Sequence, residues 1–293
     1  MHRKRFIQLT LGGIIMSGLE PLFSLSKSLK DEDYILPAYF IGHGSPMNGI
    51  ENNSFSQSWA QIGKEYPTPN AVLVVSAHWL TRGTYITAME HPKTIHDFGG
   101  FPQKLFDVQY PAPGNPSLAL DTTKLVTSTK VELDHEWGLD HGVWTVVRHM
   151  YPNANIPVLQ LSIDYGKPAQ FHYDLGKELL ALRKKGVLVI GSGNMVHNLG
   201  AVAWDKLNEP EYGYDWAIEM NTVFKDKINK GDVKSLIDYT KLHKASSLAI
   251  PTPDHYFPLL YTLGLQTQND TITFFNDKAV GGSLTMTSVK IGS

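Results

Sequence analysis

The sequence predicts a single α/β domain with a central, mostly parallel or mixed sheet, flanked by helices. Short apolar runs rich in β-branched residues recur along the chain, as expected of strands buried on both faces of a sheet. Two of them, at 156–163 and 187–192, are separated by a helical stretch at 168–185, which makes a right-handed βαβ unit. No repeat, low-complexity tract or linker interrupts residues 31–293, so a single domain is expected there.

The composition is that of a globular protein and restricts its chemistry. The 293 residues are 42% apolar and 18% charged, with a net charge of −2, so there is no basic excess suited to nucleic acid. Cysteine is absent, which excludes disulfides, thiolate zinc sites, iron–sulfur clusters and a cysteine nucleophile. A metal ion would have to be held by His, Asp or Glu, and zinc, iron or manganese fit such ligands.

Residues 1–30 differ from the rest and have the layout of a bacterial export signal. A basic head, HRKR (2–5), precedes an apolar run at 6–19 that is broken by glycines. The segment RKRFI (3–7) loosely resembles a twin-arginine signal with Lys in one Arg place. The run is too short for a transmembrane helix, and no Cys follows for a lipid anchor. An exported, periplasmic protein is expected; the alternative is a disordered or surface-packed arm on a cytoplasmic one.

The first strand of the domain is expected at 36–41, and it ends in GHGSP (42–46). Glycines on both sides of His43 permit unusual backbone angles and the close approach of a ligand. The order of residues is not a Gly-x-Ser-x-Gly nucleophile elbow. Ser45 is therefore interpreted as the cap of a helix expected at 54–66.

The strand at 71–80 has its apolar centre at 72–75, and then His78 follows where the strand should end. In open α/β sheets ligands bind outside the carboxyl ends of strands, so His78 lies where chemistry is expected. A strand at 84–89 comes next.

Two long loops and a helix at 117–125 follow this strand. Loops of this length are usually functional or lid-like. Their aromatic residues Phe98, Phe101 and Tyr110 are compatible with the wall of a pocket for a flat ligand and equally with ordinary loop packing.

Further histidines lie near the starts of helices and after a strand. His141 precedes a helix through 149, where the helix dipole favours the neutral imidazole that a proton acceptor needs. His149 and His172 stand beside polar residues and are interpreted as surface residues. The strand at 187–192 leads through glycines to His197.

The last third of the domain begins with a polar, helical excursion at 204–244. Another helix is expected to begin at PTPDHY (251–256), with Asp254 in its first turn, and this segment carries His255. Strands at 271–275 and 284–291 close the chain.

Four separate segments thus bring His43, His78, His197 and His255 to turns or strand ends, with His141 as a fifth. Each alone has an ordinary interpretation as a hydrogen-bonded core or loop residue. Together, in a chain without cysteine, they predict a metal site, since neutral imidazole is the commonest nitrogen ligand for zinc and iron. The ligands are far apart in sequence, unlike those of an HExxH helix, so the fold must assemble the site.

Seven motifs follow one another along the chain: GHGSPM (42–47), VSAHW (75–79), TIHDFGGFP (94–102), YPAPG (110–114), WGLDHG (137–142), SGNMVHN (192–198) and PTPDHY (251–256). In this order they resemble the LigB-type (class III) extradiol ring-cleavage dioxygenases, and within them the 4,5-DOPA-extradiol-dioxygenase branch. The resemblance covers about residues 37–292 and leaves the N-terminal extension out.

The resemblance implies non-haem Fe(II) chemistry on a catechol with O2 as the second substrate, without nucleic acid or a membrane-spanning partner. His43, His78 and His255 match the metal-ligand positions of the family. His197 matches a position that is either a further ligand or the acid–base residue, and His141 matches a second active-site histidine.

The third ligand position departs from the founding members, which have a carboxylate there. Asp254 could contribute, but helix capping is the preferred interpretation. An all-histidine set also suits Zn(II), which has no accessible redox chemistry.

Two other functions remain open at this point. One is a zinc-dependent hydrolase on a similar sheet, and the other is a non-enzymatic, Memo-like binding protein. Neither the natural catechol nor the oligomeric state is determined by the sequence.

Overall fold

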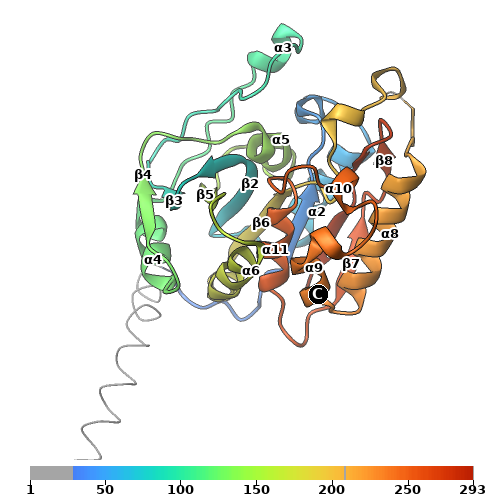
Figure 1. Ribbon diagram of the computed structural model, residues 1–293. Coiled ribbons are helices and arrows are strands. Elements are labelled where there is room, and N and C mark those ends of the chain that lie inside the picture. The colour runs from blue at the N-terminus through green and yellow to red at the C-terminus, as the bar shows by residue number, and fades with distance from the viewer. Residues whose placement is uncertain (1–28, 208, 293) are drawn as a thin grey trace, which may run out of the picture.

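The structure is a computed structural model that describes residues 29–207 and 209–292 (Figure 1). The export signal expected at 1–30 lies outside the described residues, except for its last two, and stays a prediction. Among the residues that are described, no helix combines the length and apolarity that crossing a membrane requires.

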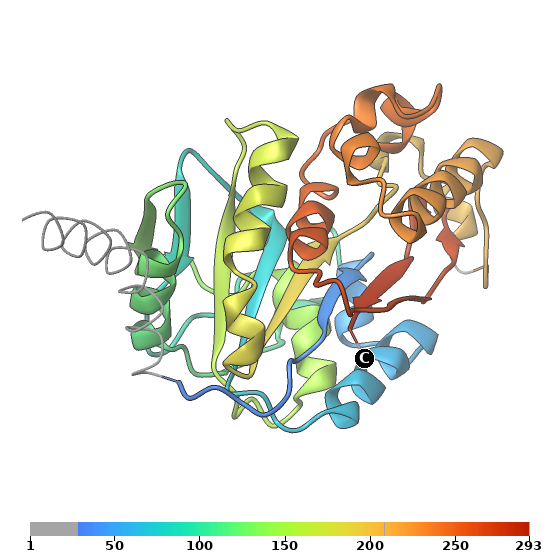
Figure 2. The ribbon, with the colours of Figure 1, turned by 90° about the horizontal axis from the view of Figure 1, so that it is seen from below.

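An eight-stranded mixed sheet forms the centre, in the order β4-β3-β5-β2-β6-β1-β10-β7 (Figures 1 and 2). The four strands β5, β2, β6 and β1 run parallel, while β10 and β7 are antiparallel to their neighbours. The strands are β1 (Ala38–Gly42), β2 (Ala71–Thr81), β3 (Thr84–Thr87), β4 (Val131–Asp134), β5 (Val158–Asp164), β6 (Val187–Gly193), β7 (Ile272–Phe275) and β10 (Ser288–Ile291), and β8 (Ala279–Val280) pairs separately with β9 (Leu284–Thr285).

Helices cover both faces of the sheet, as expected for the α/β class. The helices are α2 (Ser54–Glu65), α3 (Gln103–Phe106), α4 (Pro116–Leu125), α5 (His141–Met150), α6 (Ala169–Glu178), α7 (Ala181–Lys184), α8 (Asp215–Asn229), α9 (Val233–Ile237), α10 (Ser246–Ala249) and α11 (Phe257–Gly264), with 3-10 turns η1 (Pro46–Gly49), η2 (Leu199–Ala201), η3 (Trp204–Lys206) and η4 (Tyr239–Lys241). Apolar residues of α2 and α5 share one core, and those of α4, α6, α8 and α11 share the other.

Strand β2 shows why this sequence folds in layers. Side chains alternate between the two faces of a strand: Val72 and Val74 enter the core under α2 and α5, and Leu73 and Val75 enter the opposite core. Burial on both faces is what the continuous apolar run predicts. The strand ends at Thr81, one residue later than expected, and its pairing with β5 is interrupted after Val75 and resumes at Leu80.

The prediction that Ser45 caps the helix after β1 is wrong. The hydroxyl of Ser45 accepts a hydrogen bond from the backbone N–H of Met47 and so caps η1. The cap of α2 is Asn53, which accepts hydrogen bonds from two backbone N–H groups and forms a capping box with Ser56. A separate 3-10 turn, η1, forms between β1 and α2, so Ser45 caps the helical segment that directly follows it.

His172 is buried, so its interpretation as a surface residue is wrong, while His149 is half-buried. The His172 ring stacks on Phe257 at a centroid distance of 4.1 Å, and its Nδ1 lies 3.1 Å from the hydroxyl of Tyr261. Helix α6 turns this side chain toward α11, and polar sequence neighbours do not reveal such a contact. Burial lowers the pKa of His172 to about 4.

This pKa predicts an acid-dependent loss of stability. The unfolded chain binds the proton at pH values below about 6.5, and the folded protein binds it only near pH 4. Stability is therefore lost as the pH falls from 6.5 toward 4. Relative to His172→Gln, which does not titrate, we expect the free energy of unfolding of the wild type to drop by about 2 kcal/mol between pH 7.5 and pH 5.

Urea unfolding of both proteins at the two pH values measures this difference. Contributions from other titrating groups are common to both proteins and cancel. Parallel pH profiles for the two proteins would contradict the prediction.

Candidate metal centre

Three of the predicted histidines follow neighbouring parallel strands. Strands β2, β6 and β1 are adjacent and run in the same direction, so their carboxyl ends lie at one edge of the sheet. His43 comes directly after β1, His78 lies where the ladder of β2 is interrupted, and His197 follows β6. The topology therefore delivers the three side chains to the same side of the molecule.

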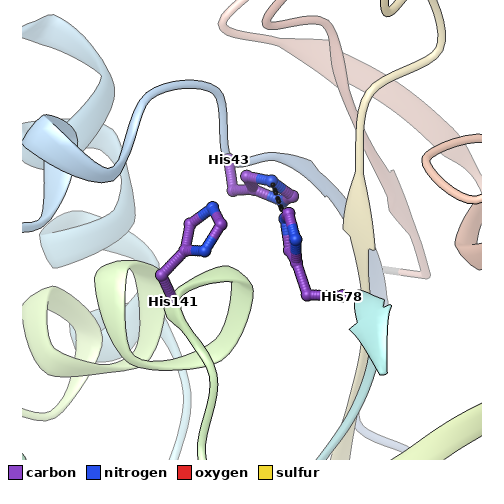
Figure 3. A group of neighbouring side chains, drawn as sticks. All are labelled: His43, His78 and His141. Atoms are coloured by element: carbon purple, nitrogen blue, oxygen red, sulfur yellow. Dashed lines mark hydrogen bonds between the residues drawn. The ribbon is translucent and has the colours of Figure 1, made fainter. Parts of the chain in front are cut away.

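Two other segments bring His255 and His141 to this edge. The loop before α11 packs against the end of β6, where a Cβ at Gly193 would lie 2.2 Å from the carbonyl oxygen of His255. Only glycine permits this approach. His141 is the first residue of α5, as expected, and points from that helix toward His43 and His78 (Figure 3).

The imidazole nitrogens meet at short distances. Nε2 of His43 lies 3.1 Å from Nε2 of His78 (Figure 3). Nitrogens of His43, His78 and His141 all lie within 4.8 Å of one another, and the same holds for ligand atoms of His197, Asp254 and His255. The two groups are neighbours, because the ring centre of His255 lies 5.3 Å from that of His43 and 4.9 Å from that of His78.

The rings of His43, His78 and His255 form a nearly equilateral triangle, since the third centroid distance, between His43 and His78, is 5.0 Å. A nitrogen bound about 2.0–2.1 Å from an ion puts its ring centre roughly 3.2 Å away, so tetrahedrally placed rings lie about 5 Å apart. The triangle therefore fits three ligands of one ion.

The ring of His197 is placed differently. It stacks on His255 with a centroid distance of 3.5 Å and an interplanar angle of 7°. Two rings in such a stack are closer than ligands of one tetrahedral ion. His197 thus lies beside the triangle, and its role as a further ligand stays a prediction.

The hydrogen bonds of His43 identify the nitrogen that is available to a metal. Its Nδ1 lies 2.9 Å from the hydroxyl oxygen of Ser192, and that hydroxyl donates to the carbonyl oxygen of Gly142 at 2.5 Å. Because the hydroxyl proton of Ser192 is used in the bond to Gly142, its oxygen accepts a hydrogen bond from Nδ1–H of His43. The lone pair of His43 therefore lies on Nε2, which faces the centre.

Asp254 has a different role from the capping that the sequence suggests. Helix α11 begins three residues later, and the carboxylate instead makes a short hydrogen bond to Nδ1 of His255. Burial opposes ionisation of Asp254, but this bond and the charge of His255 outweigh it and hold the pKa well below its usual value. Asp254 therefore accepts the Nδ1 proton of His255 and leaves Nε2 available.

Asp97 is the residue that sequence reasoning missed. One of its oxygens lies 3.4 Å from Nδ1 of His78, and the other lies 3.0 Å from Nδ1 of His141. The available signal was a carboxylate within the motif TIHDFGGFP (94–102). From the sequence, only the aromatic residues of this loop were considered as site residues. Each ring of the triangle thus has an oxygen at Nδ1, which is typical of metal-bound histidines.

The environment favours the neutral imidazole at His43, His78 and His197. Burial, with smaller contributions from neighbouring imidazoles, lowers the pKa of His43 and His78 well below the ordinary value. Burial and then His255 lower the pKa of His197 to about 3, against the opposing charge of Asp254. Metals bind the neutral imidazole, so these side chains are in the ligating form at pH 7. Imidazole nitrogens as donors fit a transition metal rather than magnesium or calcium.

A protein-family model described as "Catalytic LigB subunit of aromatic ring-opening dioxygenase" matches residues 37–284. The chain belongs to the LigB family. As such it is a metal-dependent extradiol ring-cleavage dioxygenase, and the fold and function expected from the motifs are confirmed.

Relatives of this LigB enzyme cover nearly the whole domain. It is 49% identical over 261 residues to "4,5-DOPA dioxygenase extradiol" of Escherichia coli K12, covering 88% of this chain and 95% of that one. Identity to proteins of the same name is 35% in Mirabilis jalapa, covering 79% and 87% of the two chains, and 33% in Beta vulgaris, covering 89% and 98%. A crystal structure of an uncharacterized protein from Escherichia coli K12 superimposes with a TM-score of 0.76 at 43% identity, covering 88% and 100%.

The aromatic residues of the two loops in this LigB enzyme have two different roles: one contacts the site, and another packs in the core. The ring of Phe98 meets His141 edge to face at 5.6 Å, and Phe101 packs against Phe98 at 5.4 Å. Tyr110 is buried, and its hydroxyl donates to the carbonyl oxygen of Tyr151 at 2.9 Å. Phe98 therefore belongs to the site and Tyr110 to the core.

Proposed function

We propose that this LigB enzyme opens the ring of a DOPA-like catechol beside its two hydroxyl groups, using O2 at one non-haem Fe(II) held by His43, His78 and His255. The triangle of imidazole centres, 4.9 to 5.3 Å apart, is the observation that carries the assignment of the ligands. The catechol class is inferred from relatives that are named as DOPA dioxygenases.

The choice of iron follows from the reaction. Bound Fe(II) supplies a redox-active centre with open positions for a catechol and O2, which Zn(II) does not. With three histidines as its protein ligands, a bound metal would have room for further ligands, because a tetrahedral or larger coordination shell needs at least one more.

The remaining histidines are proposed to handle the protons. His197 takes a hydroxyl proton of the catechol, and His141 assists. Oδ1 of Asp97 lies 3.0 Å from Nδ1 of His141, so a proton on Nδ1 leaves Nε2 as the nitrogen able to accept another. Phe98, against the His141 ring, restricts water near the reacting groups.

An anaerobic loading experiment tests this function. Metal-free protein is loaded with Fe(II), titrated with L-DOPA, and then exposed to air. We expect O2 uptake equal to the L-DOPA consumed and a yellow ring-opened product. Protein loaded with Zn(II) is the control and is expected to bind metal without consuming O2.

O2 uptake by the zinc-loaded or the metal-free protein at the rate of the Fe(II)-loaded protein would contradict the proposal. The zinc-dependent hydrolase would instead show cleavage of an ester or amide by the zinc-loaded protein without O2. Neither that function nor a Memo-like binding role is favoured by the relatives above, which carry dioxygenase names.

A further inference from the structure

Asp97 contacts two active-site imidazoles with its two oxygens. Oδ2 lies 3.4 Å from Nδ1 of His78, and Oδ1 lies 3.0 Å from Nδ1 of His141. The side chain is only 17% exposed, although the loop backbone around it faces solvent. The carboxylate is thus turned inward from the loop onto two rings that come from different elements, β2 and α5.

A backbone hydrogen bond determines which oxygen faces which ring. The backbone N–H of His141 donates to Oδ1 of Asp97 at 2.9 Å. A backbone amide can only donate, so the atom at this position must be an acceptor. The second atom of the Asp97 head group is then directed at His78.

The nearest other acid has different partners. Asp140 precedes His141 in the chain, but it accepts from the hydroxyl of Ser76 at 2.7 Å and makes a short hydrogen bond with the side-chain amide of Gln160. Ser76 in turn reaches the backbone N–H of His78 rather than its ring. The oxygens at the Nδ1 atoms of His78 and His141 therefore come from Asp97.

We propose that Asp97 is a positioning residue that sets the tautomer of two imidazoles at once. It holds the proton of His78 on Nδ1, so that the Nε2 lone pair is directed at the metal. It also holds the proton of His141 on Nδ1, so that Nε2 remains able to accept a proton from the substrate. The part concerning His141 rests on the function proposed above, whereas the part concerning His78 needs only a bound metal.

This role makes Asp97→Asn a more severe change than Asp97→Ala for metal binding. The asparagine can keep the hydrogen bond from the backbone of His141 only with its oxygen at the Oδ1 position. Its NH2 group then faces Nδ1 of His78 and donates to it, which places the ring proton on Nε2 and removes the lone pair that binds the metal. Alanine removes the partner without favouring the wrong tautomer.

Zn(II) affinity, measured by competition with a chelating dye, tests the order of the variants. We expect Asp97→Asn to weaken Zn(II) binding by about 10–100-fold, as for partners behind metal-bound histidines, and Asp97→Ala to weaken it less. Asp107→Asn is the matched control and is expected to match the wild type. Asp107 lies, like Asp97, in the segment between β3 and α4. It is exposed, and its carboxylate accepts a hydrogen bond from the side chain of Gln103 at 2.9 Å.

Nitrogen-15 spectra of the histidine rings provide a second readout that a purely structural role would not change. In the Zn(II)-loaded wild-type protein the ring proton of His78 is expected on Nδ1, whereas in Asp97→Asn at the same Zn(II) concentration it is expected on Nε2. The wild-type spectrum decides even if a variant fails to fold. Wild-type His78 with its proton on Nε2, or Asn and Ala variants with equal Zn(II) affinity, would overturn the proposal.

Both measurements use the metal alone, without a catechol or O2. A failure of ring cleavage therefore leaves the result for Asp97 standing. Conversely, an active enzyme whose His78 tautomer does not depend on Asp97 would overturn this inference and leave the proposed function intact.

Discussion

His78→Ala is expected to abolish metal retention and, with it, ring cleavage. The variant removes one corner of the imidazole triangle and leaves His43 and His255 as two nitrogen donors 5.3 Å apart between ring centres. Loss of a direct ligand should exceed the roughly 10–100-fold effect of losing a group behind a ligand, so turnover is expected to fall by more than about 100-fold. His43→Ala is expected to behave in the same way.

Metal content after gel filtration, measured together with O2 uptake on L-DOPA, checks this result. His91→Ala is the control, because His91 is an exposed histidine outside the cluster. Its metal content is expected to equal that of the wild type. If His78→Ala still holds stoichiometric metal, the ligand assignment is wrong.

His197→Gln is expected to lose turnover by about 10²–10⁴-fold, the usual contribution of a positioned proton acceptor. The stacked ring of His197 lies beside the triangle, so the variant leaves His43, His78 and His255 in place. We therefore expect the Fe(II)-loaded variant to keep its metal and to lose kcat. His141→Gln is expected to lose less, in keeping with its assisting role.

Measuring kcat and iron content of both variants in parallel separates the two roles that the sequence left open for His197. A variant that loses iron along with kcat would make His197 a further ligand rather than the acid–base residue. A larger loss of kcat in His141→Gln than in His197→Gln would reverse the proposed roles and would point to the ring backed by Asp97 as the main proton acceptor.

Much of the fold was predictable because buried strands and helices require apolar residues at positions that can be recognised in the local sequence. The run at 72–75 is apolar at every position because β2 is covered on both faces. The glycine-flanked His43 and the glycine-rich end of β6 indicate where strands end, at the edge of the sheet where the histidines meet. The side-chain partners were not predictable in the same way. Asp254 has the sequence position of a helix cap but hydrogen-bonds the ring of His255 instead. His172 has polar sequence neighbours but stacks on Phe257, which is distant in the sequence.

The sequence by itself determined the α/β class, the family and the five histidines that the structure brings together, since strand patterns and motif order depend on residues close together in the chain. Only the tertiary structure decided which rings form a triangle, which nitrogen each presents, and that Asp97 stands behind two of them. Those properties depend on the order of strands in the sheet and on hydrogen bonds between segments as far apart as residues 97 and 141. Such contacts are set by the packing of the whole domain.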